Sequence, residues 1–166
     1  MESQQQKIES IRALPLVSVD LVLVRDGREI LLGLRTNRPA QGSWFVPGGR
    51  ILKNEKRADA LARVARHELG IADIHALAPS FLGPFEHFYP DCFAGDIGVS
   101  THYVVLAHRI DVPAGFEVPG IDDQHEAEEG KEHHVELLEA REDASKAFQA
   151  PEQPLDLIAA LVHLAV

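Results

Sequence analysis

Apolar residues along the chain recur in two patterns, and the first predicts strands. PLVSVDLVLV (15–24) is a nearly continuous apolar run rich in β-branched residues, as is typical of a buried strand. The turn signal Asp26-Gly27 follows it, and EILLGLRT (29–36) predicts a second strand. Further strands are indicated by the short run WFVPGG (44–49), which ends in a Pro-Gly-Gly break, by PSFLGPFEHFYP (79–90) and by THYVVLAHRIDVP (101–113).

The second pattern, apolar residues at helical spacing, predicts helices. Residues 55–69 contain no Pro or Gly, carry Ala, Leu and Val at helical spacing, and are followed by Gly70 as a stop. A short helix is expected over 4–13, before Pro15, a weaker one over 133–147, and an apolar one over 154–166. The mixture of strands and helices favours an α+β fold with a mixed sheet.

Length and composition indicate one domain over residues 1–166, with 45% hydrophobic residues. No apolar run is long enough to cross a membrane, and the N-terminus lacks the apolar stretch of a secretory signal. The single cysteine, Cys92, gives no support for an oxidising compartment. We therefore expect a cytoplasmic protein that does not bind membranes.

Charge is distributed unevenly. The net charge of −10 argues against nucleic-acid binding, because a phosphate backbone is repelled by such a surface. Residues 35–66 nevertheless carry eight basic residues against two acids, whereas residues 122–143 contain ten acids. A local basic zone fits a small anionic ligand, although solvated helix faces would give the same pattern.

The most specific pattern begins at Gly49. Five residues separate Gly49 from Glu55, seven more separate Glu55 from Arg63, and Glu68, Gly70 and Ile71 follow. This frame, over about 49–71, resembles the Nudix box, G-x5-E-x7-R-E-U-x-E-E-x-G-U, in which U is aliphatic.

Two glutamates of the box are replaced, by Val64 and His67. Positions 64, 67 and 68 share one helix face. In the full box that face holds several hard cations through carboxylates, whereas here only Glu68 remains. Val64 cannot bind Mg²⁺ and His67 is a poor ligand for it, so we expect one ion, unless the box is simply inactive.

The surrounding stretches extend the resemblance. Five stretches are similar to the GDP-mannose mannosyl hydrolase branch of the Nudix hydrolases: PLVSVD (15–20), GLRTNRPAQGSWFVPGGR (33–50), EHFYPD (86–91), THYVVL (101–106) and DDQH (122–125). The similarity covers about residues 14–126. It implies a Nudix α/β/α sandwich with a mixed sheet and a homodimer, with 4–13 as a swapped or docking element.

The activity implied by this resemblance is Mg²⁺-dependent hydrolysis of GDP-mannose or a related GDP-hexose. Water attacks C1 of the sugar with inversion, and GDP leaves as a stabilised anion. The loss of carboxylates fits this reaction, since it requires no metal-bound nucleophile at phosphorus.

The resemblance also implies roles for individual residues. Mg²⁺, for which Mn²⁺ is an expected substitute, would be held by the Gly49 carbonyl, Glu68 and Gln124. His125 would be the general base, since a neutral imidazole can accept the proton of the attacking water, and Asp122 and Asp123 would orient it. For Glu68 and His125 the alternative is a surface acid and a surface histidine.

Three arginines are candidate diphosphate contacts, Arg35, Arg50 and Arg63, because guanidinium groups match phosphate oxygens. Arg63 is equally suited to brace the box by pairing with Glu55.

By resemblance, His87 and Tyr103 contact the diphosphate or sugar, although strand packing would also explain them. Asp20, an acid inside an apolar strand, would bind a sugar hydroxyl, or it marks a turn or a subunit contact. Trp44 and Phe45 are interpreted as core residues.

Two other functions remain open. An ordinary Nudix pyrophosphohydrolase would act at phosphorus and give GMP and hexose 1-phosphate, and Val64 and His67 argue against it. A non-catalytic sugar-nucleotide-binding module would keep the pocket without turnover, and Gln124 and His125 argue against that.

Overall fold

One mixed sheet organises the fold. The computed structural model describes residues 3–27, 29–35, 37–119 and 133–139. Strand β1 (Leu16–Arg25) runs parallel to β6 (Thr101–Val112) over its whole length, and β6 pairs antiparallel with β5 (Ser80–Tyr89). The predicted α+β class with a mixed sheet is confirmed.

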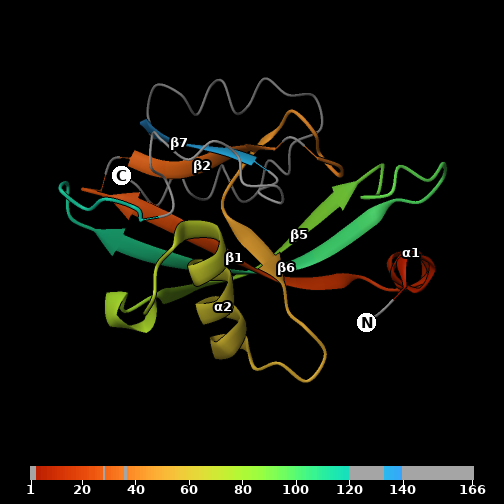
Figure 1. The fold of residues 1–166 in the computed structure, drawn as a ribbon, viewed down its shortest axis with the longest axis horizontal. Helices are drawn as coiled ribbons and strands as arrows, with labels where there is room; N and C mark the ends of the chain where they lie inside the picture. The colour runs from red at the N-terminus through yellow and green to blue at the C-terminus, as the bar shows by residue number, and fades with distance from the viewer. Residues whose placement is uncertain (1–2, 28, 36, 120–132, 140–166) are drawn as a thin grey trace.

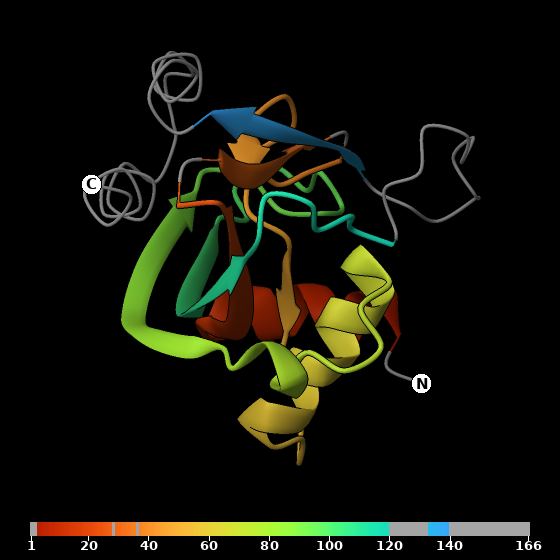
Figure 2. The ribbon, with the colours of Figure 1, turned by 90° about the vertical axis from the view of Figure 1, so that its left-hand side faces the viewer.

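The other edge of β1 divides between two partners. Its C-terminal end pairs with β2 (Glu29–Arg35), whereas residues 18–20 pair with β4 (Gly48–Arg50). β2 then pairs with β3 (Trp44–Phe45) and, over all seven of its residues, with β7 (His133–Glu139). β7 lies alongside β2 in Figures 1 and 2. β2 pairs only with the C-terminal end of β1. The pocket described below lies at the N-terminal half of β1, where β4 has taken the place of β2.

Two expected elements are corrected. WFVPGG was expected to be a short strand that ends in a Pro-Gly-Gly break, and β3 does end before Pro47. Gly48 and Gly49, however, begin a second strand, β4, that pairs with β1, and between the two strands the Pro47 carbonyl accepts from the Leu21 N–H (2.8 Å). The helix expected over 133–147 is wrong for residues 133–139, which form β7 because β2 offers a full antiparallel edge to them. The helix expected over 154–166 lies outside the described residues.

Helix α2 (Arg57–Leu69) packs on one face of the sheet. Its apolar side, Leu61, Val64, Ala65 and Leu69, meets Val19, Leu21 and Leu23 of β1 and Ile110 of β6 in the main core. The helix ends at Gly70, whose positive φ of 67° is easily reached only without a side chain. It begins two residues later than predicted, because Glu55 stays in the preceding loop and accepts a hydrogen bond from the Leu52 N–H (2.8 Å).

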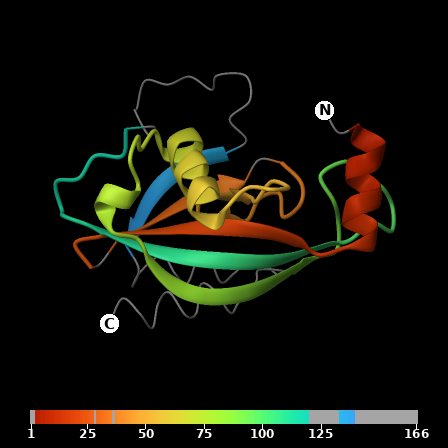
Figure 3. The ribbon, with the colours of Figure 1, turned by 90° about the horizontal axis from the view of Figure 1, so that it is seen from below.

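Helix α1 (Gln4–Ala13) stands at one end of the long strands, away from α2 (Figure 3). Ser3 caps it, and Ile8 and Ile11 pack against Cys92 and Val99 of the loop that joins β5 to β6. The N-terminal segment thus docks on its own chain, and the expected homodimer stays a prediction. Within the described residues, neither helix has the length and apolarity that crossing a membrane requires.

Candidate functional site

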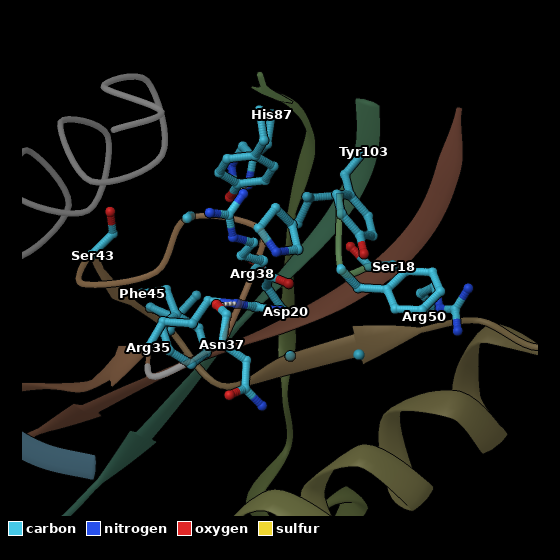
Figure 4. Close-up of a pocket in the computed structure, with 18 of the residues that line it drawn as sticks. Ser18, Asp20, Arg35, Asn37, Arg38, Ser43, Phe45, Arg50, His87 and Tyr103 are labelled. Atoms are coloured by element: carbon cyan, nitrogen blue, oxygen red, sulfur yellow. Dashed lines mark hydrogen bonds between the residues drawn. The ribbon is translucent and has the colours of Figure 1, made fainter. Parts of the chain in front are cut away.

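A pocket of about 720 Å³ lies at the N-terminal half of β1, where β1 pairs with β4 and no longer with β2. Its walls come from β1, from the loop between β2 and β3, from β4, from the β5–β6 pair and from α1. Figure 4 shows polar side chains around it from β1, β2, the loop between β2 and β3, β4, β5 and β6. Among the residues that line it are Ser18, Asp20, Arg35, Asn37, Arg38, Phe45, Gly49, Arg50, Glu68, His87, Tyr89, Phe93 and Tyr103.

The floor at β4 is set by the approach of α2. A Cβ on Gly49 would lie 2.9 Å from Cγ2 of Val64, which is shorter than real Cβ contacts, so only glycine fits there. Val64 is 2% exposed and fills the space between helix and strand. The position that holds a glutamate in the full box is therefore occupied by hydrocarbon in the core.

Glu68 is the box acid that reaches the pocket, with a side chain 16% exposed. His67 lies on the outside of the helix, 72% exposed, with Nδ1 2.9 Å from Oε1 of Glu68. The two departures from the box thus differ physically, since one is a buried packing residue and the other a surface neighbour of the remaining acid.

Arg63 makes the contacts of a brace. Its guanidinium donates to both carboxylate oxygens of Glu55 (2.7 and 2.8 Å) and to the Arg50 carbonyl (2.8 Å). The hydrogen bonds from Arg63 are the main cause that lowers the pKa of Glu55 to about 2. Arg63 is not among the residues that line the pocket, and its contacts tie the loop before α2 to β4.

Asp20 projects from β1 into the same pocket. A Cβ on Gly48 would lie 2.3 Å from Oδ1 of Asp20, so the glycine makes room for the carboxylate. Burial raises the pKa of Asp20 to about 7, and the positive charge of Arg35 partly offsets this shift. The carboxyl therefore keeps its proton to a much higher pH than an exposed aspartate does.

Arg35 is held at the other side of Asp20. Its Nε donates to the Asn37 carbonyl (3.2 Å), and its guanidinium lies 5.4 Å from the centre of the Phe45 ring. A cation over an aromatic face is stabilised by the ring quadrupole. Arg35 and Arg50 therefore line the pocket from two different strands, β2 and β4.

The β5–β6 pair supplies the far wall. His87 and Tyr103 are register partners, so the sheet itself places them side by side. Tyr89, two residues after His87, points to the same face and has its hydroxyl 3.4 Å from Nδ1 of His87. Burial, followed by the charge of Asp20, raises the pKa of Tyr89, so the phenol stays protonated.

Sequence reasoning missed several pocket residues. Trp44 and Phe45 were interpreted as core, but both are half-buried and line the pocket. Lys7, Arg38, Tyr89 and Phe93 also line it. Only Tyr89 had a usable signal, its alternation with His87 along one strand.

Four residues expected at the site lie outside the described residues: Asp122, Asp123, Gln124 and His125. Of the predicted residues that the structure describes, the pocket brings together Asp20, Arg35, Gly49, Arg50, Glu68, His87 and Tyr103.

Whether the pocket can hold a metal ion depends on the ligands that its residues offer. Within the described ranges, no three His, Cys, Asp or Glu side chains gather in a metal-binding group. Two carboxylates line the pocket, Asp20 and Glu68; Glu68 is the one from the box helix, and the β4 backbone at Gly49 lines the pocket with it. Such oxygen donors fit a single hard cation that completes its shell with substrate oxygens and water.

Comparison with known proteins identifies the type of domain. The family model described as the NUDIX domain matches residues 14–153. A curated relative, the low-salt glycan biosynthesis protein Agl8 of Haloferax volcanii, is 50% identical over 96 residues, which are 58% of this chain and 58% of the relative. The match thus spans little more than half the length of that relative.

Solved structures share the fold. A MutT NUDIX hydrolase from Burkholderia pseudomallei has a TM-score of 0.58 at 23% identity, with 92% of this chain and 99% of that chain covered. A MutT protein from Methanosarcina mazei Go1 has a TM-score of 0.59 at 17% identity, covering 92% and 94%. The NUDIX domain of Shewanella oneidensis NrtR, solved with ADP ribose, has a TM-score of 0.57 at 16% identity, covering 98% and 96%. At these identities the likeness establishes the fold.

Asp20→Asn is expected to change how stability depends on pH. The folded-state pKa of about 7 exceeds the ordinary value of 3.8, so the folded state binds this proton more tightly than the unfolded state. The wild-type free energy of unfolding should therefore fall, relative to the variant, as pH rises through that window, by on the order of 4 kcal/mol. Urea unfolding at several pH values measures this. The exposed Glu117→Gln variant is the control, and parallel curves for wild type and Asp20→Asn would contradict the account.

Restoring the two box acids should have unequal costs. Val64→Glu forces a larger, charged side chain between α2 and Gly49, and should lower the free energy of unfolding by about 2–4 kcal/mol. His67→Glu changes an exposed position and should stay within about 0.5 kcal/mol of wild type. Urea unfolding without metal tests both variants, and equal stability of Val64→Glu and wild type would show that Val64 is not a packing residue.

Proposed function

Because this chain belongs to the Nudix family, we propose that it hydrolyses GDP-mannose or a related GDP-hexose to GDP and the free sugar. Family membership supports a hydrolase of nucleoside diphosphate compounds. The choice of a sugar nucleotide has two further supports: the glycan-biosynthesis name of the relative Agl8, and the ADP ribose bound to the NrtR domain of the same fold.

The observation that carries the proposal is the composition of the box face. Val64 is buried beneath Gly49, His67 is directed outward, and Glu68 is the acid of this face that reaches the pocket. A site with one box carboxylate is poorly equipped to assemble several cations around phosphorus. It is better suited to neutralise a diphosphate that departs from carbon.

The diphosphate would lie between β2 and β4. Arg35 and Arg50 project into the pocket from these strands, and guanidinium groups pair well with phosphate oxygens. A Mg²⁺ ion held by Glu68, the Gly49 carbonyl and Gln124 would add charge neutralisation of the leaving group, and Mn²⁺ should replace it. Arg63 contributes indirectly, because it fixes the Arg50 backbone and Glu55.

The sugar would lie beyond the diphosphate, near Asp20, His87 and Tyr103. These groups offer donors and acceptors to hydroxyls in a largely buried setting. In the proposed step, water oxygen bonds to C1, His125 accepts the water proton, and the C1–O bond breaks with its electron pair leaving on GDP. A base of this kind contributes about 10²–10⁴ in rate, and Asp123 would orient it.

Hydrolysis in ¹⁸O-labelled water distinguishes the possible reactions. The proposal predicts GDP and free hexose as products, with the label in the sugar. Label in phosphate, together with GMP and hexose 1-phosphate, would instead identify an ordinary Nudix pyrophosphohydrolase. Mass spectrometry of the separated products locates the label.

His125→Ala is the matched variant for the same assay. It should lower kcat by at least about 10² without a comparable loss of GDP binding. A wild type that bound GDP-mannose but turned it over no faster than this variant would be a binding module.

A further inference from the structure

Arg38 is a pocket cation that neither the box nor the proposed mechanism uses. It lies in the loop between β2 and β3 and lines the pocket, as Figure 4 shows. The base of this loop is closed by backbone hydrogen bonds, from the Arg35 N–H to the Ser43 carbonyl (2.9 Å) and from the Gly42 N–H to the Arg35 carbonyl (2.7 Å). The loop therefore holds its shape through contacts that do not involve the Arg38 side chain.

Asp91 faces Arg38 from the loop that follows β5. The Asp91 carbonyl accepts from the Thr101 hydroxyl (2.7 Å), and the next residue, Cys92, is buried together with Val99 against Ile8 and Ile11 of α1. This loop too is fixed by its backbone and its apolar contacts. Neither loop depends on the Arg38–Asp91 pair for its position.

The pair itself is loose. The Nη1 atom of Arg38 and the Oδ2 atom of Asp91 are 3.7 Å apart, with side chains 52% and 28% exposed. An exposed pair at this separation stabilises a fold very little. Beside it, a Cβ on Gly95 would come within 3.8–4.0 Å of Arg38 Cδ, Nη1 and Nε, so the arginine side chain lies along the backbone at Gly95. This arrangement places the Arg38 guanidinium at the pocket with only a weak ion pair to Asp91.

We propose that Arg38 is a further anion-binding residue of this pocket, which leaves Asp91 and pairs with the diphosphate when a nucleoside diphosphate sugar binds. The inference takes its class of ligand from the proposed function, and it does not depend on which bond of that ligand is cleaved. A diphosphate is the stronger partner because it offers several charged oxygens to the guanidinium fork, whereas Asp91 holds one contact at 3.7 Å. Asp91 then acts as a competitor that the ligand displaces.

The competition predicts opposite effects for the two partners. Arg38→Met should weaken GDP binding about tenfold, the loss expected for one charge-assisted contact. Asp91→Asn removes the competitor and should tighten GDP binding about twofold to fivefold. The double variant should bind like Arg38→Met, because the gain from Asp91→Asn requires the arginine. Isothermal titration calorimetry with GDP and with ADP, each with Mg²⁺, gives the dissociation constants of wild type and the three variants.

Arg109 and Asp111 form the control pair. They make an ion pair of 2.8 Å on β6, with side chains 21% and 61% exposed, and are not among the residues that line the pocket. Arg109→Met and Asp111→Asn change the net charge in the same way and should leave the GDP dissociation constant within about twofold of wild type. Thermal unfolding of every variant checks that it is folded. Arg38→Lys, which keeps the charge without the fork, should fall between wild type and Arg38→Met.

Three results would overturn the proposal. If Arg38→Met and Asp91→Asn weakened binding equally, the pair would be a structural bridge between the loops. If neither changed binding, Arg38 would not contact the ligand, and if wild type bound neither diphosphate, the pocket would not be a diphosphate site. Cleavage at phosphorus rather than at carbon would refute the proposed function and leave this test intact, because it measures binding without turnover.

Discussion

The close approach of α2 to β4 is the constraint on which the rest of the site depends. Val64 lies so near Gly49 that any side chain on the glycine would overlap it. This contact fixes the distance between helix and strand, and with it the reach of Arg63 to the Arg50 carbonyl and to Glu55. It also places Glu68 at the pocket beside the backbone of β4. Val64, which first reads as a missing metal ligand, is thus part of the frame that places Glu68, the metal ligand that we propose.

The second constraint is the burial of polar groups on the face of β1 that points away from α2. β1 is apolar on both faces, but Asp20 interrupts it where β2 and β4 separate. Burial raises the pKa of Asp20 to about 7, and Arg35 only partly compensates. Keeping a carboxyl there costs stability once it ionises, and a core built for stability alone would not retain it. The same wall carries His87, Tyr89 and Tyr103, so the cost is concentrated at one polar surface.

Much of this arrangement could be predicted from the sequence. The spacing from Gly49 to Ile71 identified the box, and continuous apolar runs located β1, β2, β5 and β6. Local pattern failed where pairing decides the structure. Nothing in WFVPGG shows that its ends join different strands, and residues 133–139 form β7 because β2 offers an edge. Likewise, the path of the loop between β2 and β3 brings Arg38 and Phe45 to the pocket, and no spacing rule predicts that path.

The central claim is that packing of Val64 against Gly49 has left one cation site where the full box holds several. Its most direct test is the number of Mn²⁺ ions bound per chain at saturating GDP, counted from the free-ion signal in electron paramagnetic resonance. The account predicts a single ion, lost in Glu68→Gln, because Glu68 is the box acid that faces the pocket. Two or more ions per chain in wild type would contradict it.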